Sequence, residues 1–284
     1  MALAQVNGTE IWYELQGSGE PILLLPGLGL DHGYYRLGEP LLRKSLKTLL
    51  VDPRGIGKSR KDAPDKVRYT AELWGDDFAA LVRQLDVGPV HVLGSSLGGC
   101  MAMSIADRHP DIVKSLICVG AFSELDRAME INFRLRKKIV AKCGMGEEIA
   151  DFMGLFTMSR EYLDSDAGFK VMQGNQVLLK NNSPDLYQAF LDTILWWGRK
   201  MPGQENTPLF TTRLKNFRFP TLVVSADNDY FIPAKFSRII ADNIHGAKYA
   251  EVPGGGHIPF IEKPNQSTEV VLQFIRSLAG TENV

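Results

Sequence analysis

Short apolar runs alternate with helical patterns along most of this chain, and that alternation limits the possible folds more than any other feature. The apolar runs lie at 21–26, 46–52, 89–94, 114–120, 220–226 and 247–253. They are apolar on successive rather than alternate residues, which is typical of parallel strands covered on both faces. Helical patterns lie at 70–86, 96–109, 233–244 and 265–279, and Thr70 is the expected N-cap of the first. The sequence therefore predicts an α/β fold with a mostly parallel, doubly wound sheet.

Two departures from the alternation indicate the domain organisation. Near the N-terminus, Asn7-Gly8 separates two extended segments, which predicts a hairpin at the sheet edge. From about residue 124 to 215 only helical patterns occur, and we interpret this segment as an inserted helical cap. The expected organisation is a core domain made of residues 1–123 and 216–284, with a helical cap (lid) domain at 124–215.

Composition and charge narrow the class of ligand. A chain of 284 residues with 44% hydrophobic and 23% charged residues can form one large α/β domain or a domain with an insertion. Its 32 basic and 33 acidic residues leave no net charge that would favour nucleic acid or a membrane surface as partner. The first residues, MALAQVNGTE, lack the basic and apolar regions of a signal peptide. We therefore expect a cytoplasmic protein that acts on a small molecule, and the sequence does not indicate its oligomeric state.

A serine flanked by glycines lies where one apolar run meets a helical pattern. The stretch Gly94-Ser95-Ser96-Leu97-Gly98 matches G-x-S-x-G with Ser96 at its centre, whereas Ser95 has leucines at the glycine positions. The motif requires a sharp turn from strand into helix, in which side chains two positions before and after the central residue would collide. A glycine-softened turn without chemistry is the alternative interpretation. The strand pattern before the motif and the helical pattern behind it favour a nucleophile at Ser96.

A serine nucleophile needs a histidine to take its proton and an acid to orient that histidine. His257 lies on a glycine-rich loop after the last predicted strand, at the carboxyl edge of the sheet where ligands bind in such folds. His32 lies in the loop after the first main strand and is a candidate to line a pocket. Asp227 and Asp229 both follow a strand, and either is a candidate acid or a turn former. The remaining histidines, which we interpret as structural, are His91, His109 and His245.

Blocks at 23–31, 51–59, 93–99 and 225–264 resemble the signatures of the α/β-hydrolase superfamily, and the resemblance covers almost the whole chain. It implies a serine hydrolase with a helical cap, similar to the esterase, enol-lactonase and haloperoxidase-like branch. Carried over by position, Ser96 matches the nucleophile and His257 the base, in the family's order of serine, acid and histidine. The family's acid usually lies four residues before a proline, so Asp229, before Pro233, matches better than Asp227.

The resemblance also implies an oxyanion hole built from backbone N–H groups. The two amides would be those of Leu97, directly after the nucleophile, and Leu28, in the loop after the first central strand. The chain departs from the commonest form of that loop because it has Pro26-Gly27 where many relatives have His-Gly. Since the donor is an amide, this departure changes what braces the loop and need not abolish the hole.

Caps in this family cover the nucleophile and set specificity. The apolar side chains of the cap are therefore candidates for binding substrate. The alternative is that they pack only against other helices, as many helical Met and aromatic residues do. The candidates are Phe152, Met153, Phe156, Met158, Met172, Trp196 and Trp197, together with His32 outside the cap. They favour a small to medium, largely apolar ester or lactone, cleaved through an acyl-enzyme without metal or organic cofactor. Two alternatives stay open: hydrolysis of a carbon–carbon bond in a diketone-type substrate, and a ligand receptor that retains a slow triad.

Overall fold

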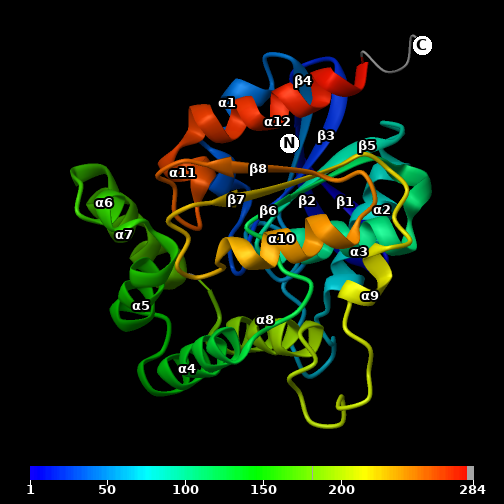
Figure 1. Cartoon of the computed structure of the whole chain (residues 1–284). Helices are drawn as coiled ribbons and strands as arrows, with labels where there is room; N and C mark the ends of the chain where they lie inside the picture. Colours follow the sequence, from blue (N-terminus) through cyan, green and yellow to red (C-terminus); the bar gives the residue numbers. More distant parts are fainter. Residues whose placement is uncertain (181, 280–284) are drawn as a thin grey trace.

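The structure, a computed structural model, describes residues 1–180 and 182–279, and of residues 175–180 it describes the backbone alone. Within these ranges, eight strands form one sheet in the order β1-β2-β4-β3-β5-β6-β7-β8 (Figure 1). The strands β1 (Ala2–Val6) and β2 (Thr9–Gln16) pair antiparallel, and β2 also pairs antiparallel with β4. All other neighbouring strands are parallel. The predicted fold class, a mostly parallel α/β sheet, is confirmed.

The apolar runs of the sequence form the parallel strands. These are β3 (Glu20–Leu25), β4 (Leu46–Val51), β5 (Val90–Ser95), β6 (Val113–Val119), β7 (Thr221–Ala226) and β8 (Lys248–Val252). Successive residues of β3, from Ile22 to Leu25, are fully buried, as expected where helices cover both faces. At the sheet edge, Asn7 and Gly8 have φ angles of 45° and 73°, the left-handed values that a tight hairpin turn requires.

Helices cover the two faces of the sheet (Figure 1). One face carries α1 (Glu39–Leu42) and α12 (Pro264–Ala279), and the other carries α2 (Ala71–Gln84), α3 (Leu97–Arg108) and α10 (Ala234–Asn243). The Oγ1 of Thr70 accepts a hydrogen bond of 3.0 Å from the Leu73 amide, so Thr70 is the N-cap that the sequence predicts for α2. Other short helices of the core lie in loops, namely η1 (His32–Tyr35), η2 (Pro110–Ile112) and α11 (Pro259–Glu262).

Between β6 and β7 the described residues form helices and loops without a strand. The helices are α4 (Arg127–Cys143), α5 (Glu147–Thr157), α6 (Arg160–Leu163), α7 (Asp166–Lys180), α8 (Pro184–Trp197) and α9 (Thr211–Leu214). Figure 1 shows α5 to α7 at the left of the view and α4 and α8 at the bottom, outside the sheet and the helices that cover it. In α8, the ring of Phe190 packs against Trp74 and Tyr69, with ring centroids 5.4 Å and 5.1 Å away. That this segment is a separate cap domain with boundaries at 124 and 215 stays a prediction.

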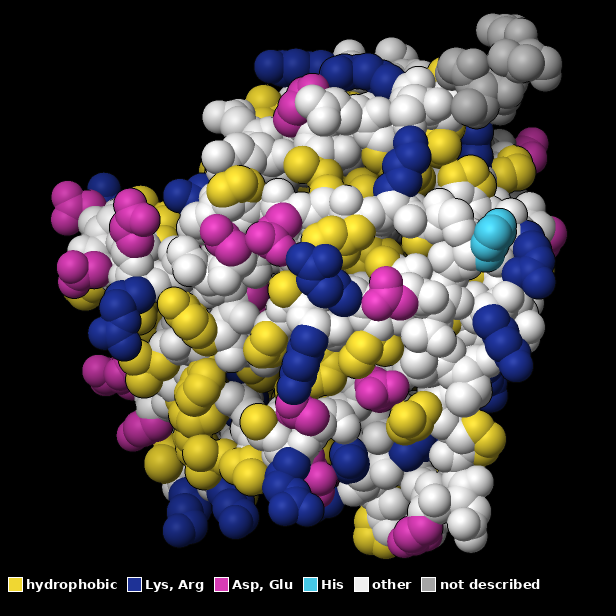
Figure 2. Space-filling model, viewed as in Figure 1, with side chains coloured by type: hydrophobic (Ala, Val, Ile, Leu, Met, Phe, Trp, Pro, Cys, Tyr) yellow, Lys and Arg dark blue, Asp and Glu magenta, His cyan; other side chains and the backbone are white. Residues whose placement is uncertain are grey.

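The outer surface of this helical layer is partly apolar. Figure 2 shows hydrophobic side chains gathered over α4 and α5, where Ile131, Leu135 and Leu155 are exposed. Within the described ranges, none of the helices combines the length and the apolar character that crossing a membrane requires.

The strand order locates a crevice at one point of the sheet. From β3 the chain continues to β4 on one side and later returns to β5 on the other side of β3. The loops that leave the carboxyl ends of β3 and β5 therefore run in opposite directions, and ligands bind in the crevice between such loops. The loop after β3 begins at Pro26, and β5 ends directly before Ser96.

Candidate active site

Ser96 occupies a strained turn between β5 and α3. Its backbone angles, φ 55° and ψ −120°, lie in a region that residues other than glycine seldom adopt. The turn is held because the Ser96 amide donates a hydrogen bond of 2.9 Å to the carbonyl of Val119, at the end of the neighbouring strand β6. The side chain of Ser96 caps no backbone group of α3, so its hydroxyl is not committed to holding the helix.

The glycines of the motif allow the backbone to pack closely around this turn. A Cβ at Gly94 would lie 2.1 Å from the carbonyl oxygen of Gly98, and a Cβ at Gly98 would lie 2.3 Å from the carbonyl oxygen of Leu25. Real Cβ atoms do not approach backbone that closely, and here both obstacles are backbone atoms. Side chains at positions 94 and 98 would therefore collide with backbone, as the sequence motif implies.

His257 and Asp229 are brought together at the carboxyl edge of the sheet. Nδ1 of His257 lies 2.7 Å from Oδ2 of Asp229, and both side chains are buried. The other oxygen of Asp229 accepts the amides of Phe231 and Ile232 at 2.9 Å and 2.7 Å. Because a carboxylate only accepts, Nδ1 donates, which leaves the lone pair of a neutral ring on Nε2.

Asp227 has a different environment from Asp229. It is exposed, and its Oδ1 accepts the Gly254 amide at 2.6 Å, which ties the loop after β7 to the loop after β8. Among the described residues, only Asp229 of the two candidate acids contacts the ring of His257.

Ser96 and His257 face one cavity of about 900 Å³. Nε2 of His257 is buried and has no hydrogen-bond partner among the described residues. Phe231 holds the imidazole from the side, with ring centroids 4.9 Å apart and planes at 87°. An unoccupied basic nitrogen and an uncommitted hydroxyl in one cavity are the groups that proton transfer from a serine requires, and such pairs often close only when substrate binds.

The backbone beside Ser96 offers two N–H groups that the sequence predicts for an oxyanion hole. Gly27 packs against the nucleophile turn, since a Cβ there would lie 3.4 Å from Cβ of Ser96. The next residue, Leu28, lines the cavity, and Leu97 begins α3. Neither amide has an acceptor among the described residues.

His32 lines the same cavity and is held by Asp52. Its Nδ1 lies 2.7 Å from Oδ1 of Asp52, and its own amide donates to the same oxygen at 2.9 Å. The second oxygen of Asp52 accepts the Lys58 amide at 2.8 Å. Asp31, His32 and Asp52 form a cluster of potential metal ligands, but three N–H groups of the protein already occupy the carboxylate of Asp52. The cluster therefore serves to orient the His32 ring at the cavity wall.

The charge on His32 links stability to pH. Burial opposes that charge, but the hydrogen bond that His32 donates to Asp52 and the negative charge of Asp52 outweigh burial and raise the pKa of His32 above its ordinary value. The stabilisation is thus fully present below about pH 6.5 and is lost as the pH rises through the raised pKa. Because the pair is partly exposed, we expect the melting temperature of the wild type to fall by at most about 2 °C from this cause as the pH rises. His32→Gln should abolish this fall. Thermal unfolding of both proteins from about pH 5.5 to 9 measures it, and parallel curves would contradict it.

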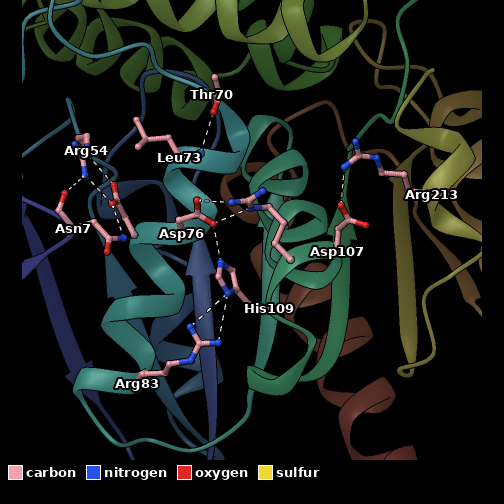
Figure 3. A network of polar contacts seen from close by, with 11 residues as sticks. Asn7, Arg54, Thr70, Leu73, Asp76, Arg83, Asp107, His109 and Arg213 are labelled. Atoms are coloured by element: carbon pink, nitrogen blue, oxygen red, sulfur yellow. Dashed lines mark hydrogen bonds and ion pairs between the residues drawn. The ribbon is translucent and has the colours of Figure 1, made fainter. Parts of the chain in front are cut away.

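The other histidines lie away from the cavity, as the sequence analysis proposes. His91 is buried at the opposite end of β5, between Ser115 and Glu20 at 2.7 Å each. Figure 3 shows His109 at the end of α3, where its Nε2 lies 2.7 Å from Asp76 and its Nδ1 faces Arg83. His245 is exposed after α10. The same view shows Arg54 of the 51–59 loop paired with a buried carboxylate of α2, which is a structural contact.

Most of the cap residues that the sequence suggests as lining do not reach the cavity. Only Met153 of the seven cap candidates lines the cavity with Ser96. Trp197 is buried, stacks on Phe210 at 4.1 Å and donates from Nε1 to the Phe122 carbonyl. Trp196 lies under the guanidinium of Arg68, beside a second cavity. The candidates that lie outside the first cavity are Phe152, Phe156, Met158, Met172, Trp196 and Trp197. Apart from Trp196, we attribute them to packing against neighbouring elements, which is the usual use of the buried stripe of an amphipathic helix.

Sequence reasoning missed Glu262, which holds the loop of His257 to α5. Its carboxylate accepts the Ser159 hydroxyl at 2.6 Å and the Gly256 amide at 3.1 Å. The His257 amide donates to the Thr157 carbonyl at 2.8 Å, so two contacts connect this loop to the end of α5. Burial raises the pKa of Glu262. The sequence offered one signal, a glutamate within the largely apolar stretch HIPFIEKP. Acidic side chains are seldom buried without partners, so a glutamate there indicates a polar contact.

Sequence reasoning also missed Arg136, which lines the cavity from α4. The buried residues of this helix are Met129, Asn132, Phe133, Arg136 and Val140, which lie on one face. An arginine on that stripe was the signal that could have identified it, since arginine is almost never fully buried without a paired charge.

Comparison with known proteins agrees with this architecture. The family model for the alpha/beta hydrolase fold matches residues 20–264. A protein of Azorhizobium caulinodans, provisionally named carbamate hydrolase RutD, is 27% identical over 275 residues, which cover 96% of this chain and 98% of that protein.

Two solved structures are similar in fold. The enol-lactonase from Burkholderia xenovorans LB400 has a TM-score of 0.83 at 23% identity, covering 97% of this chain and 100% of that one. An esterase from Thermogutta terrifontis has a TM-score of 0.80 at 24% identity, covering 97% and 96%. The sheet order, the strained turn after β5 and the matched family model together establish that this chain belongs to the alpha/beta hydrolase fold family and is an enzyme of the hydrolase class.

Proposed function

We propose that the protein hydrolyses a carboxylic ester or lactone, with Ser96 as nucleophile, His257 as general base and Asp229 as the residue that orients His257. The observation that carries the proposal is the 2.7 Å contact between Nδ1 of His257 and Oδ2 of Asp229, in a cavity that also exposes Ser96. The solved esterase and enol-lactonase of similar fold support the choice of ester or lactone chemistry.

In the first step, Oγ of Ser96 bonds to the carbonyl carbon while its proton passes to Nε2 of His257. The carbonyl oxygen becomes negatively charged, and the amides of Leu28 and Leu97 stabilise it by hydrogen bonds. The bond from carbon to the leaving oxygen then breaks, and the proton on Nε2 passes to that oxygen. For a lactone, the leaving alcohol stays attached to the acyl group.

In the second step, a water molecule attacks the acyl-enzyme. His257 takes a proton from the water and returns it to Oγ of Ser96 when the carbon–serine bond breaks. The net reaction adds one water to the ester and yields an acid and an alcohol. The cavity volume of about 900 Å³ suits a small to medium substrate.

A substrate panel tests this proposal. We expect short-chain aryl esters and simple lactones to be hydrolysed over many turnovers, and mass spectrometry of a rapidly quenched reaction to place an acyl adduct on Ser96. Turnover of β-diketones without turnover of esters would instead indicate carbon–carbon bond hydrolysis. A single turnover followed by tight retention of product would indicate a receptor. An adduct on any other residue would contradict the assignment of Ser96.

A further inference from the structure

Arg136 is a buried cation that the proposed chemistry leaves unused. It is 1% exposed, and it lines the cavity that contains Ser96 and His257. Its Nε donates to Oδ1 of Asn132 at 2.9 Å, whereas its Nη2 is buried without a hydrogen-bond partner. Among the described residues, no carboxylate forms an ion pair with it. Burying a guanidinium with an unused N–H group is unfavourable in free energy. The arrangement therefore indicates an anionic ligand, since the described residues supply no anion to Arg136.

Aromatic rings position this guanidinium close to the reacting groups. Cζ of Arg136 lies 4.3 Å from the ring centroid of Phe231. Phe231 also contacts His257, at 4.9 Å between ring centroids. The guanidinium and the imidazole therefore both contact the same phenyl ring. Because Arg136, Ser96 and His257 line one cavity, a single molecule can place an anionic group at Arg136 and a carbonyl carbon at Ser96.

The rest of the cavity wall carries the same sign of charge. Its other basic side chains, all exposed, are Arg36, Lys58, Lys61 and Lys170, and the described residues pair none of them with a carboxylate. Among the described residues that line the cavity, Asp31 is the only acidic one. Clefts lined by one sign of charge attract ligands of the opposite sign and raise their rate of association. This supports an anionic substrate independently of Arg136.

We propose that the substrate is an ester or lactone that also carries a carboxylate, and that Nη2 of Arg136 binds this carboxylate. A guanidinium forms charge-assisted hydrogen bonds to a carboxylate in a fixed planar geometry, which also orients the rest of the molecule. The desolvated site then rejects a neutral analogue, which would leave the guanidinium unpaired. Burial lowers the pKa of Arg136, and the neighbouring Tyr187 opposes this. That the substrate is an ester or lactone rests on the proposed function, whereas the anion site itself does not.

The first experiment compares matched substrates. Monomethyl glutarate and monomethyl adipate carry a carboxylate, whereas methyl pentanoate and methyl hexanoate have the same chain lengths without it. Acid release in a pH-stat gives the ratio of kcat/KM for the anionic ester to that for the neutral one. We expect this ratio to exceed one in the wild type and to fall about 10- to 100-fold in Arg136→Met. Arg136→Lys, which keeps the charge but loses the planar donor geometry, should give an intermediate ratio.

Arg134→Met is the matched control, because Arg134 lies on the same helix, is exposed and pairs with Glu130. It should keep the wild-type ratio. Arg136→Met should also melt no lower than the wild type, since replacing a buried unpaired charge by an apolar side chain of similar size removes a cost. An equal ratio in wild type and Arg136→Met would overturn the inference. A large drop in melting temperature with an unchanged ratio would assign Arg136 a structural role.

Binding separates this inference from the proposed function. Calorimetry with glutarate on Ser96→Ala protein, with and without Arg136→Met, needs no turnover. Arg136-dependent binding of glutarate without any ester hydrolysis by the wild type would uphold the anion site and refute the proposed activity. Ester hydrolysis that depends on Ser96, with glutarate binding unaffected by Arg136→Met, would uphold the activity and refute the anion site.

Discussion

Ser96→Ala should lower kcat/KM for ester hydrolysis by about 10⁴- to 10⁶-fold, the loss expected when a serine nucleophile is removed from a working triad. The fold should be unaffected, because the Ser96 side chain caps no group of α3 and faces a cavity. Steady-state kinetics together with circular dichroism and thermal unfolding measure both parts of this expectation. A phosphonate inhibitor should label the wild type at Ser96 and fail to label the variant.

Ser95→Ala is the control for this substitution. Its hydroxyl is buried and lies 2.9 Å from the hydroxyl of Tyr34, so the variant loses one hydrogen bond worth about 1 kcal/mol. Activity should fall less than about tenfold, since no reacting atom is removed. Near-wild-type hydrolysis by Ser96→Ala, or a label on Ser95, would show that the nucleophile has been assigned to the wrong serine.

Asp229→Asn should lower kcat by about 10²- to 10⁴-fold with little change in KM. An asparagine at this position can present its NH₂ group to Nδ1 of His257, which favours the ring tautomer with a proton on Nε2. That tautomer cannot accept the proton of Ser96. The hydrogen bonds that Oδ1 accepts from Phe231 and Ile232 can be kept by the amide oxygen, so the loop should stay in place.

Asp227→Asn is the matched control, two residues away in the same loop. Asp227 is exposed and only accepts the Gly254 amide, which an asparagine oxygen can also do. Its kcat should stay within about threefold of the wild type, because surface changes of this kind are usually small. If Asp227→Asn were the more damaging of the two, the orienting acid would have to be reassigned.

The local pattern of the sequence was sufficient for the sheet and for the turn that carries Ser96. Strand and helix periodicity depends on neighbouring residues, so runs such as 21–26 and 114–120 could be placed within a residue or two of β3 and β6. The need for glycine at 94 is also a local property, because a Cβ there would collide with the backbone of Gly98 in the same turn. The choice of Asp229 over Asp227 needed the family resemblance as well, and in the structure Asp229 is the one that contacts His257.

The lining of the cavity could not be derived in the same way. Periodicity shows which face of a helix is buried but not what that face meets, so Trp197 and Met153 gave the same signal although one packs on Phe210 and the other lines the cavity. The choice of seven cap residues as lining came from this ambiguity, whereas apolar residues that do line the cavity, such as Leu28, Ile56 and Ile258, lie outside the cap segment.

The sequence by itself determined the α/β fold and the strained turn at Ser96, because both depend on residues close together in the chain. The order of the candidate serine, acid and histidine followed from their positions together with the family resemblance. Only the tertiary structure decided that Arg136 of α4 lies against Phe231 from the loop after β7, and that Glu262 joins the His257 loop to Ser159. These contacts join segments far apart in the sequence. Their energies depend on burial and on which partners are within reach, and both quantities exist only once the chain has folded.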